Sequence, residues 1–124
     1  MNDRWIGLGS RDEAAAATEV WREVAEHLAE RGEALWSTDQ FGVEATLRLA
    51  DAEQLVVGKE GGQIIACMAI DTQDPVFWPE EEVGSALYLH KIAARPGGLR
   101  GWTADFVEWA AAEAIRKRIP RLRL

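Results

Sequence analysis

The chain has 124 residues, of which 48% are apolar and 28% are charged, and its formal net charge at pH 7 is −7. This length suits a single domain with its own core, and the composition excludes a disordered chain. The acidic total excludes a general nucleic-acid binder, whose footprint would be basic. The charge is divided unevenly, because residues 1–89 carry 6 basic and 18 acidic side chains whereas residues 90–124 carry 8 basic and 3 acidic. A cationic end on an acidic body predicts two kinds of ligand surface.

Cys67 is the single cysteine of the chain, so the sequence excludes an internal disulfide framework. Its apolar neighbours predict that it lies in the core. No segment approaches the roughly 18 apolar residues that a membrane-spanning helix needs. The first five residues lack the basic start and apolar run of a signal peptide. We therefore expect a cytoplasmic protein that binds neither membrane nor nucleic acid.

The N-terminal third has a helical pattern. Ser10 and Glu13 form a capping-box signature before apolar residues that recur at spacings of three and four from Ala17 to Leu28. Gly32 then supplies a stop signal. The pattern predicts a helix over about 11–31 and a short second helix over about 43–49, with the option of a short first strand near residues 4–8.

Strand patterns follow in the second half. Two apolar runs at 54–59 and 64–70 flank a turn at 60–63 and predict a hairpin. A polar loop over 71–84 leads to a third strand at 86–94, a helix over about 102–118 and an alternating segment at 121–124. The fold class is therefore α/β (α+β), in the order α-α-β-β-β-α-β. Its sheet is mixed and mostly antiparallel, with helices on it.

The segment Arg95–Gly101 is basic and rich in glycine, and it joins a strand to a helix. A helix N-terminus offers unpaired N–H groups to a phosphate, and glycines let the backbone come close to it. Arg95 and Arg100 would add charge-assisted hydrogen bonds. The spacing matches neither a Walker loop nor a dinucleotide fingerprint. Phosphate binding and an ordinary strand-to-helix turn are the two interpretations of this segment.

The same region resembles the GNAT superfamily of acyl-CoA-dependent N-acetyltransferases. The resemblance rests on the strand Tyr88–Arg95, on Arg100-Gly101, on Glu108-Trp109-Ala110 and on Leu122-Arg123-Leu124. It extends over residues 1–124, which we expect to form one GNAT-like domain. The loop departs from the family pattern, because Gly98 and Thr103 stand where the family usually has Gln or Arg and Gly or Ala.

The resemblance implies that acetyl-CoA lies where the strand at 86–94 diverges from the strand at 121–124. Backbone groups of Ile92, Ala93 and Ala94 would pair with the pantetheine arm as an added strand does. A small-molecule amine would then attack the thioester directly, without a covalent enzyme intermediate. The pyrophosphate would be held by the following loop and helix start, made of Arg95, Leu99, Arg100, Gly101, Trp102 and Thr103.

Such a reaction needs a base, because an alkyl amine with a pKa of about 10 must lose a proton before it attacks. His90 is the first candidate, since imidazole ordinarily titrates near pH 6.5; strand alternation places it on one face with Tyr88, Ile92 and Ala94. A structural histidine is the other interpretation. Glu82 could act through water, and Tyr88 as a general acid. Candidates for the acceptor pocket are Trp36, Phe77, Trp78 and Glu80, each with packing or solvent exposure as its alternative role.

Two further expectations concern metals and assembly. His27, His90 and Cys67 lack the spacing of a metal site, so no metal is expected. The family usually continues past the last strand with a helix and two strands, which carry the tyrosine that often protonates the leaving thiolate. The sequence ends at Leu124, so a truncated, split or decayed member is an alternative to an active enzyme. Such a module would bind acyl-CoA without turnover, or form a homodimer that covers the open sheet edge.

Overall fold

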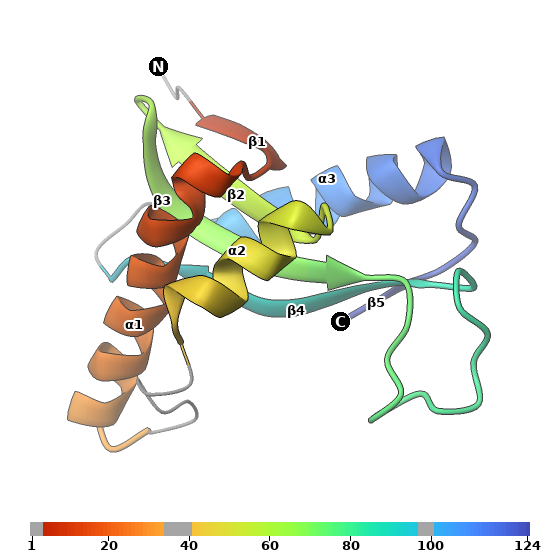
Figure 1. Cartoon of the computed structure of the whole chain (residues 1–124), viewed down its shortest axis with the longest axis horizontal. Helices are drawn as coiled ribbons and strands as arrows, with labels where there is room; N and C mark the ends of the chain where they lie inside the picture. The colour runs from red at the N-terminus through yellow and green to blue at the C-terminus, as the bar shows by residue number, and fades with distance from the viewer. Residues whose placement is uncertain (1–3, 34–40, 97–100) are drawn as a thin grey trace.

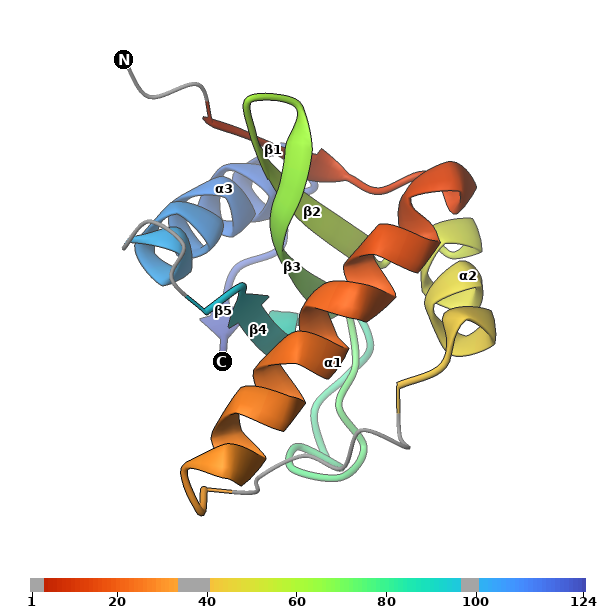
Figure 2. The ribbon, with the colours of Figure 1, turned by 90° about the vertical axis from the view of Figure 1, so that its left-hand side faces the viewer.

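A computed structural model describes residues 4–33, 41–96 and 101–124. One sheet of five strands runs through the molecule in the order β1-β2-β3-β4-β5, antiparallel except for the β4–β5 pair. Figure 1 shows α1 and α2 in front of the sheet, and Figure 2 shows α3 on the opposite face. The elements in chain order are β1 (Arg4–Leu8), the 3-10 turn η1 (Arg11–Glu13), α1 (Ala14–Glu30), α2 (Val43–Asp51), β2 (Leu55–Glu60), β3 (Gln63–Asp71), β4 (Leu87–Ala94), α3 (Trp102–Arg116) and β5 (Leu122–Arg123).

This arrangement confirms the predicted fold class, the hairpin and the short first strand. The capping box forms at Ser10, whose backbone N–H donates to Glu13 Oε1 over 3.0 Å. Its first turn is 3-10, so the helix proper begins at Ala14. The hairpin turns through Gly61 and Gly62, which both have positive φ, as a tight two-residue turn requires. Among the residues that the structure describes, no helix has the length and apolarity to cross a membrane.

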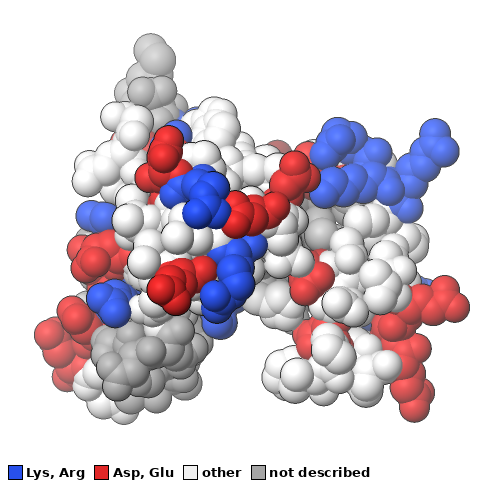
Figure 3. Space-filling view, viewed as in Figure 1, with Lys and Arg blue, Asp and Glu red and all other residues white. Residues whose placement is uncertain are grey.

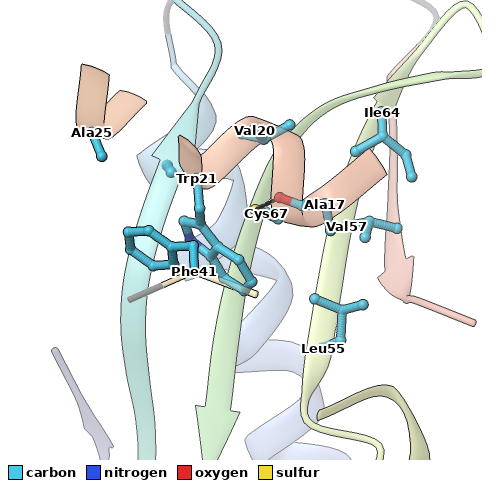
Figure 4. Close-up of a cluster of buried hydrophobic side chains, with 10 residues drawn as sticks. Ala17, Val20, Trp21, Ala25, Phe41, Leu55, Val57, Ile64 and Cys67 are labelled. Carbon is cyan, nitrogen blue, oxygen red and sulfur yellow. Dashed lines mark hydrogen bonds between the residues drawn. The ribbon is translucent and has the colours of Figure 1, made fainter. Parts of the chain in front are cut away.

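Each face of the sheet buries its own core. Cys67 is fully buried, as predicted, and its thiol donates to the carbonyl of Ala17 over 3.6 Å (Figure 4). Trp21 and Trp102 are buried on opposite faces, and Trp109 packs at the edge of the second core. The α1-side core contains Ala17, Val20, Trp21, Ala25, Phe41, Leu55, Val57, Ile64, Cys67 and Ala93, and the α3-side core contains Val56, Ala66, Met68, Ile70, Leu87, Leu89, Trp102, Phe106, Ala110 and Ala114.

Candidate functional site

The strand β4 contains a bulge at Lys91 and Ile92. Cys67 of β3 is opposite Ala93, whereas Ala69 is opposite His90, so two residues of β4 face the single residue Met68. Lys91 has φ +54°, in the left-handed region that side chains other than glycine rarely adopt. Such bulges bend a strand and redirect its side chains, and they are common beside functional sites.

Trp21 of α1 holds this bulge from the helical side. Its indole Nε1 donates to the carbonyl of Lys91 over 2.7 Å. Its ring stacks on that of Phe41 with centroids 5.8 Å apart, and Figure 4 shows these two rings side by side. The Lys91 ammonium lies 5.3 Å from the centroid of the Phe41 ring. Because the carbonyl of a bulged residue leaves the strand ladder, the indole supplies the partner that β3 no longer gives.

The bulge corrects the predicted alternation of β4. Leu87 and Leu89 belong to the α3-side core, and Ile92 and Ala94 pack against the same core. His90 instead lines a pocket on the α1 side, where its ring stacks with that of Tyr88. The prediction that His90 shares a face with Ile92 and Ala94 is therefore wrong, because one extra residue shifts the period of two.

One edge of β4 is open beyond its pairing with β5. Within the described residues, β5 pairs with β4 only through Leu87–Leu122 and Tyr88–Arg123. At the other end of β4, Arg95 donates its N–H to Ile65 of β3 over 2.8 Å. Because backbone groups alternate in direction along a strand, Ala94 and Ile92 present theirs to the open edge, and those of Ala93 are directed to β3. An extended ligand could therefore pair with Ile92 and Ala94 as an added strand.

A pocket of about 220 Å³ lies on the α1 side and reaches the bulge, since His90 and Lys91 line it. Thr46 and Asp71 are its other polar residues, and Thr46 is already hydrogen-bonded to Thr18 over 2.6 Å. The sequence reasoning did not find this pocket, because its walls come from α1, α2, β3 and β4 together. Its apolar wall consists of Trp21, Phe41, Ala45, Leu49, Ala69 and Ile70.

Three ionisable side chains, those of His90, Asp74 and Tyr88, lie close together on or beside β4. His90 Nε2 lies 4.0 Å from Oδ2 of Asp74, a side chain that is only 9% exposed. Oδ1 of Asp74 accepts the backbone N–H of Phe77 over 3.1 Å, which fixes the carboxylate. Tyr88 is 2% exposed, and its buried hydroxyl has no hydrogen-bond partner in the described part of the structure. The structure therefore stacks Tyr88 on His90, which lines the pocket, whereas Tyr88 itself does not line it. Asp74 is a neighbour of His90 that sequence reasoning missed.

Gly101 caps the N-terminus of α3 and has φ +95°. Trp102 is buried and Thr103 is exposed in the first turn, while Leu99 and Arg100 lie outside the described residues. Sequence reasoning missed Arg4 of β1 at this helix end. Its guanidinium lies 4.2 Å from the Trp102 ring and 2.5 Å from Oδ2 of Asp105, and a Cβ on Gly101 would lie 3.7 Å from its Nη1.

The positive charge of residues 90–124 lies mostly away from this helix start. Figure 3 shows Lys and Arg gathered over the C-terminal end of α3 and the segment after it, where Arg116, Lys117 and Arg118 stand. A helix of 15 residues is about 22 Å long, so this cluster is far from Gly101. Arg95, at the end of β4, is paired with Glu23 of α1 over 3.4 Å. Most of the positive charge of residues 90–124 therefore lies away from the proposed phosphate loop.

The remaining candidates lie on the loop between β3 and β4. Phe77 is 77% exposed, and Glu80 and Glu82 are exposed. The guanidinium of Arg123 lies 3.7 Å from the Trp78 ring centroid, which ties this loop to β5. None of these four lines the pocket of about 220 Å³. The candidate Trp36 lies outside the described residues.

Comparison with solved structures gives the class of fold. An acetyltransferase of the GNAT family from Listeria monocytogenes superposes with a TM-score of 0.80 at 16% identity, over 96% of this chain and 75% of that one. An acetyltransferase from Salmonella typhimurium with its cofactor acetyl-CoA gives 0.68 at 17% identity, over 94% and 65%. One from Clostridium acetobutylicum with acetyl-CoA gives 0.64 at 16%, over 100% and 80%. No protein-family model and no curated protein matches the sequence. The chain thus has the fold of the GNAT acetyltransferases.

Proposed function

We propose that the protein transfers an acetyl group from acetyl-CoA to a primary amine of a small molecule. The observation that carries this proposal is the bulge of β4, where an open strand edge and a partly enclosed pocket meet. Ile92 and Ala94 offer backbone groups on the edge, and His90 and Lys91 line the pocket. Two substrates can therefore approach the same segment of β4, His90–Ala94, from different sides. The fold shared with structures that contain acetyl-CoA supports the assignment of the donor.

The donor fits the described residues in two places. Backbone groups of Ile92 and Ala94 would pair with the amide groups of its pantetheine arm. The first N–H groups of α3, at Trp102 and Thr103, have no partner within the helix and would face its pyrophosphate. Gly101 allows the close approach because it carries no side chain. Arg95, Leu99 and Arg100 complete the proposed contacts, whereas Ala93 is left out because its backbone groups are directed to β3 and its side chain is buried.

In the transfer itself, the amine nitrogen forms a bond to the thioester carbonyl carbon, and the bond from that carbon to sulfur breaks. The amine loses a proton to His90, which lines the pocket, or through water to Glu82. The leaving sulfur gains a proton, for which the unpartnered hydroxyl of Tyr88 is the proposed donor. A backbone N–H of the bulge would polarise the thioester carbonyl. Phe77, Trp78, Glu80 and Trp36 remain proposed contacts for the outer part of the acceptor.

The test is turnover of acetyl-CoA with a panel of primary amines, followed by release of free CoA thiol. Cys67 is buried, and burial raises the pKa of its thiol, so the protein itself gives little background with a thiol reagent. We expect product with at least one amine. Binding of acetyl-CoA without turnover would instead favour the non-catalytic acyl-CoA-binding or dimerisation module. Absence of binding at millimolar acetyl-CoA would overturn both the enzyme and the acyl-CoA-binding module, and it would leave only the dimerisation module.

A further inference from the structure

The pocket beside the bulge has a composition that restricts the acceptor. Its volume of about 220 Å³ is below the ~300–1,000 Å³ of pockets for drug-sized ligands, so it suits a molecule of a few heavy atoms. Its walls are largely apolar, with the stacked rings of Trp21 and Phe41 on one side and Leu49 on another. A small acceptor with an apolar body would fill it.

Two charges of opposite sign flank this apolar space. Lys91 is exposed, and its ammonium stands over Phe41; it forms no ion pair with any residue that the structure describes. Asp71 lines the pocket at the end of β3, and it too has no cationic partner among the described residues. Its Oδ1 accepts the N–H of Thr72 over 2.7 Å, which leaves Oδ2 for a ligand. The pocket therefore carries one cation and one anion that a ligand can pair with.

The strand register places these charges on two sides of the reacting position. Ala69 is opposite His90 and Asp71 is opposite Tyr88, so Asp71 is the diagonal neighbour of His90 across the two strands. Diagonal neighbours have Cα atoms roughly 7–8 Å apart, which is enough for an ammonium group between them. Lys91 follows His90 in the bulge and reaches toward Phe41. An amine beside Asp71 and His90 would thus have the Lys91 cation within the same small pocket.

We propose that the acceptor is an α-amino acid with an apolar side chain, bound as a zwitterion in this pocket. This proposal depends on the proposed function only for the acetyl-transfer step. Its ammonium pairs with Asp71 and releases a proton to His90, and its carboxylate pairs with Lys91. Its side chain lies against Trp21, Phe41 and Leu49. The charged contacts set the class of acceptor, because a simple amine leaves Lys91 without a partner.

The experiment compares three acceptors that differ by one feature each. L-leucine has all the proposed features, isopentylamine lacks the carboxylate, and glycine lacks the side chain. We expect kcat/KM for leucine to exceed that for each of the others by about tenfold or more, since a charge-assisted hydrogen bond or a filled apolar pocket is worth at least that factor. Equal or faster acetylation of isopentylamine, or of glycine, overturns the proposal.

Substitutions at Lys91 and at Asp71 test the two charged contacts one at a time. Lys91→Met keeps the unbranched stem and is expected to remove the preference for leucine over isopentylamine while acetylation of isopentylamine continues. Asp71→Asn should raise KM for both. Arg48→Met removes an exposed cation of α2 that does not line the pocket, and it should leave the preference intact. A leucine preference that survives Lys91→Met contradicts the carboxylate contact.

Binding measured without acetyl-CoA distinguishes the failure of this proposal from that of the transfer reaction. Ligand-observed NMR reports binding of leucine and isopentylamine to the protein alone. Suppose that no amine is acetylated, but leucine binds more tightly than isopentylamine and Lys91→Met removes this difference. The proposed acceptor class is then supported, and the proposed transfer reaction is overturned. If amines are acetylated without any preference for leucine, the transfer stands and the acceptor class fails. Absence of leucine binding together with absence of turnover overturns both.

Discussion

The indole N–H of Trp21 donates to the carbonyl of Lys91 over 2.7 Å, and this bond joins the first helix to the bulge of β4. Lys91 has a left-handed backbone, which costs a residue other than glycine about 1–3 kcal/mol unless its surroundings hold it. The bond therefore acts on the geometry of the bulge as well as on the core. The bulge in turn sets which backbone groups of β4 face the open edge.

Replacing Trp21 with phenylalanine should consequently weaken acetyl-CoA binding as well as stability. The variant Trp21→Phe keeps an aromatic ring but loses the donor to Lys91. We expect the free energy of unfolding to fall by about 1–3 kcal/mol, measured by urea denaturation, and the Kd for acetyl-CoA to rise. Trp109→Phe, at the edge of the α3-side core, is the control. An unchanged Kd in a folded Trp21→Phe protein would mean that the bulge does not position the donor.

The start of α3 offers a matched pair of substitutions at Gly101. Gly101→Asp and Gly101→Asn add side chains of equal size to the same left-handed backbone, and either Cβ would be in ordinary contact with Arg4. Only aspartate adds a negative charge beside the proposed pyrophosphate. We expect the aspartate variant to bind acetyl-CoA about tenfold more weakly than the asparagine variant, which is about 1.4 kcal/mol. Titration calorimetry measures this difference. Equal affinities of the two variants would mean that the pyrophosphate does not lie beside Gly101.

His90 is proposed to accept the proton of the amine, and a conservative variant separates this role from packing. His90→Gln retains a polar side chain beside Tyr88 but cannot act as a base. We expect kcat to fall by about 10²-fold or more with little change in KM, and the dependence of kcat on pH to flatten on the acid side. A fall in stability with unchanged kcat would show that His90 is structural.

The N-terminal cap predicts a pH-dependent stability. Burial opposes ionisation of Glu13, but hydrogen bonds from Lys59 and Ser10 outweigh it and hold the pKa of this carboxyl below its usual value. A lowered pKa stabilises the folded state at neutral pH, and this contribution is lost as the pH falls through the folded-state pKa. Glu13→Gln should therefore lower the free energy of unfolding by about 1 kcal/mol at pH 7. Urea unfolding at several pH values should show this difference shrinking in acid below the ordinary glutamate pKa of about 4.3. A difference that stays constant with pH would contradict the assignment.

The sequence predicted those parts of the molecule that local patterns determine. The capping box at Ser10, the hairpin turn at Gly61-Gly62 and the buried Cys67 all follow from residues near in sequence. The family resemblance of the strand at 86–94 and of Gly101 also agrees with the fold. These features need no knowledge of distant contacts, because hydrogen bonds of caps and turns join residues a few positions apart.

The bulge and the pocket could not be predicted in this way. The run Leu87–Ala94 has no glycine or asparagine to signal a left-handed residue. Lys91 adopts that conformation where its carbonyl accepts a hydrogen bond from the indole N–H of Trp21. The sequence therefore placed the side chains of Ile92 and Ala94 on the same face of the sheet as His90, whereas they lie on the opposite face. The pocket likewise depends on contacts of Asp71, Phe41 and α2, which are far apart in sequence. The ion pair of Arg95 with Glu23 was missed for the same reason.

The central claim is that acetyl-CoA binds along the open edge of β4 and at the start of α3. The most direct test is a titration of the ¹⁵N-labelled protein with acetyl-CoA, followed by the amide resonances. We expect saturable shifts at Ile92, Ala94 and Gly101–Thr103, and much smaller ones at the C-terminal end of α3. Shifts confined to the cationic cluster at Arg116–Arg118, or no shifts at millimolar acetyl-CoA, would contradict the claim.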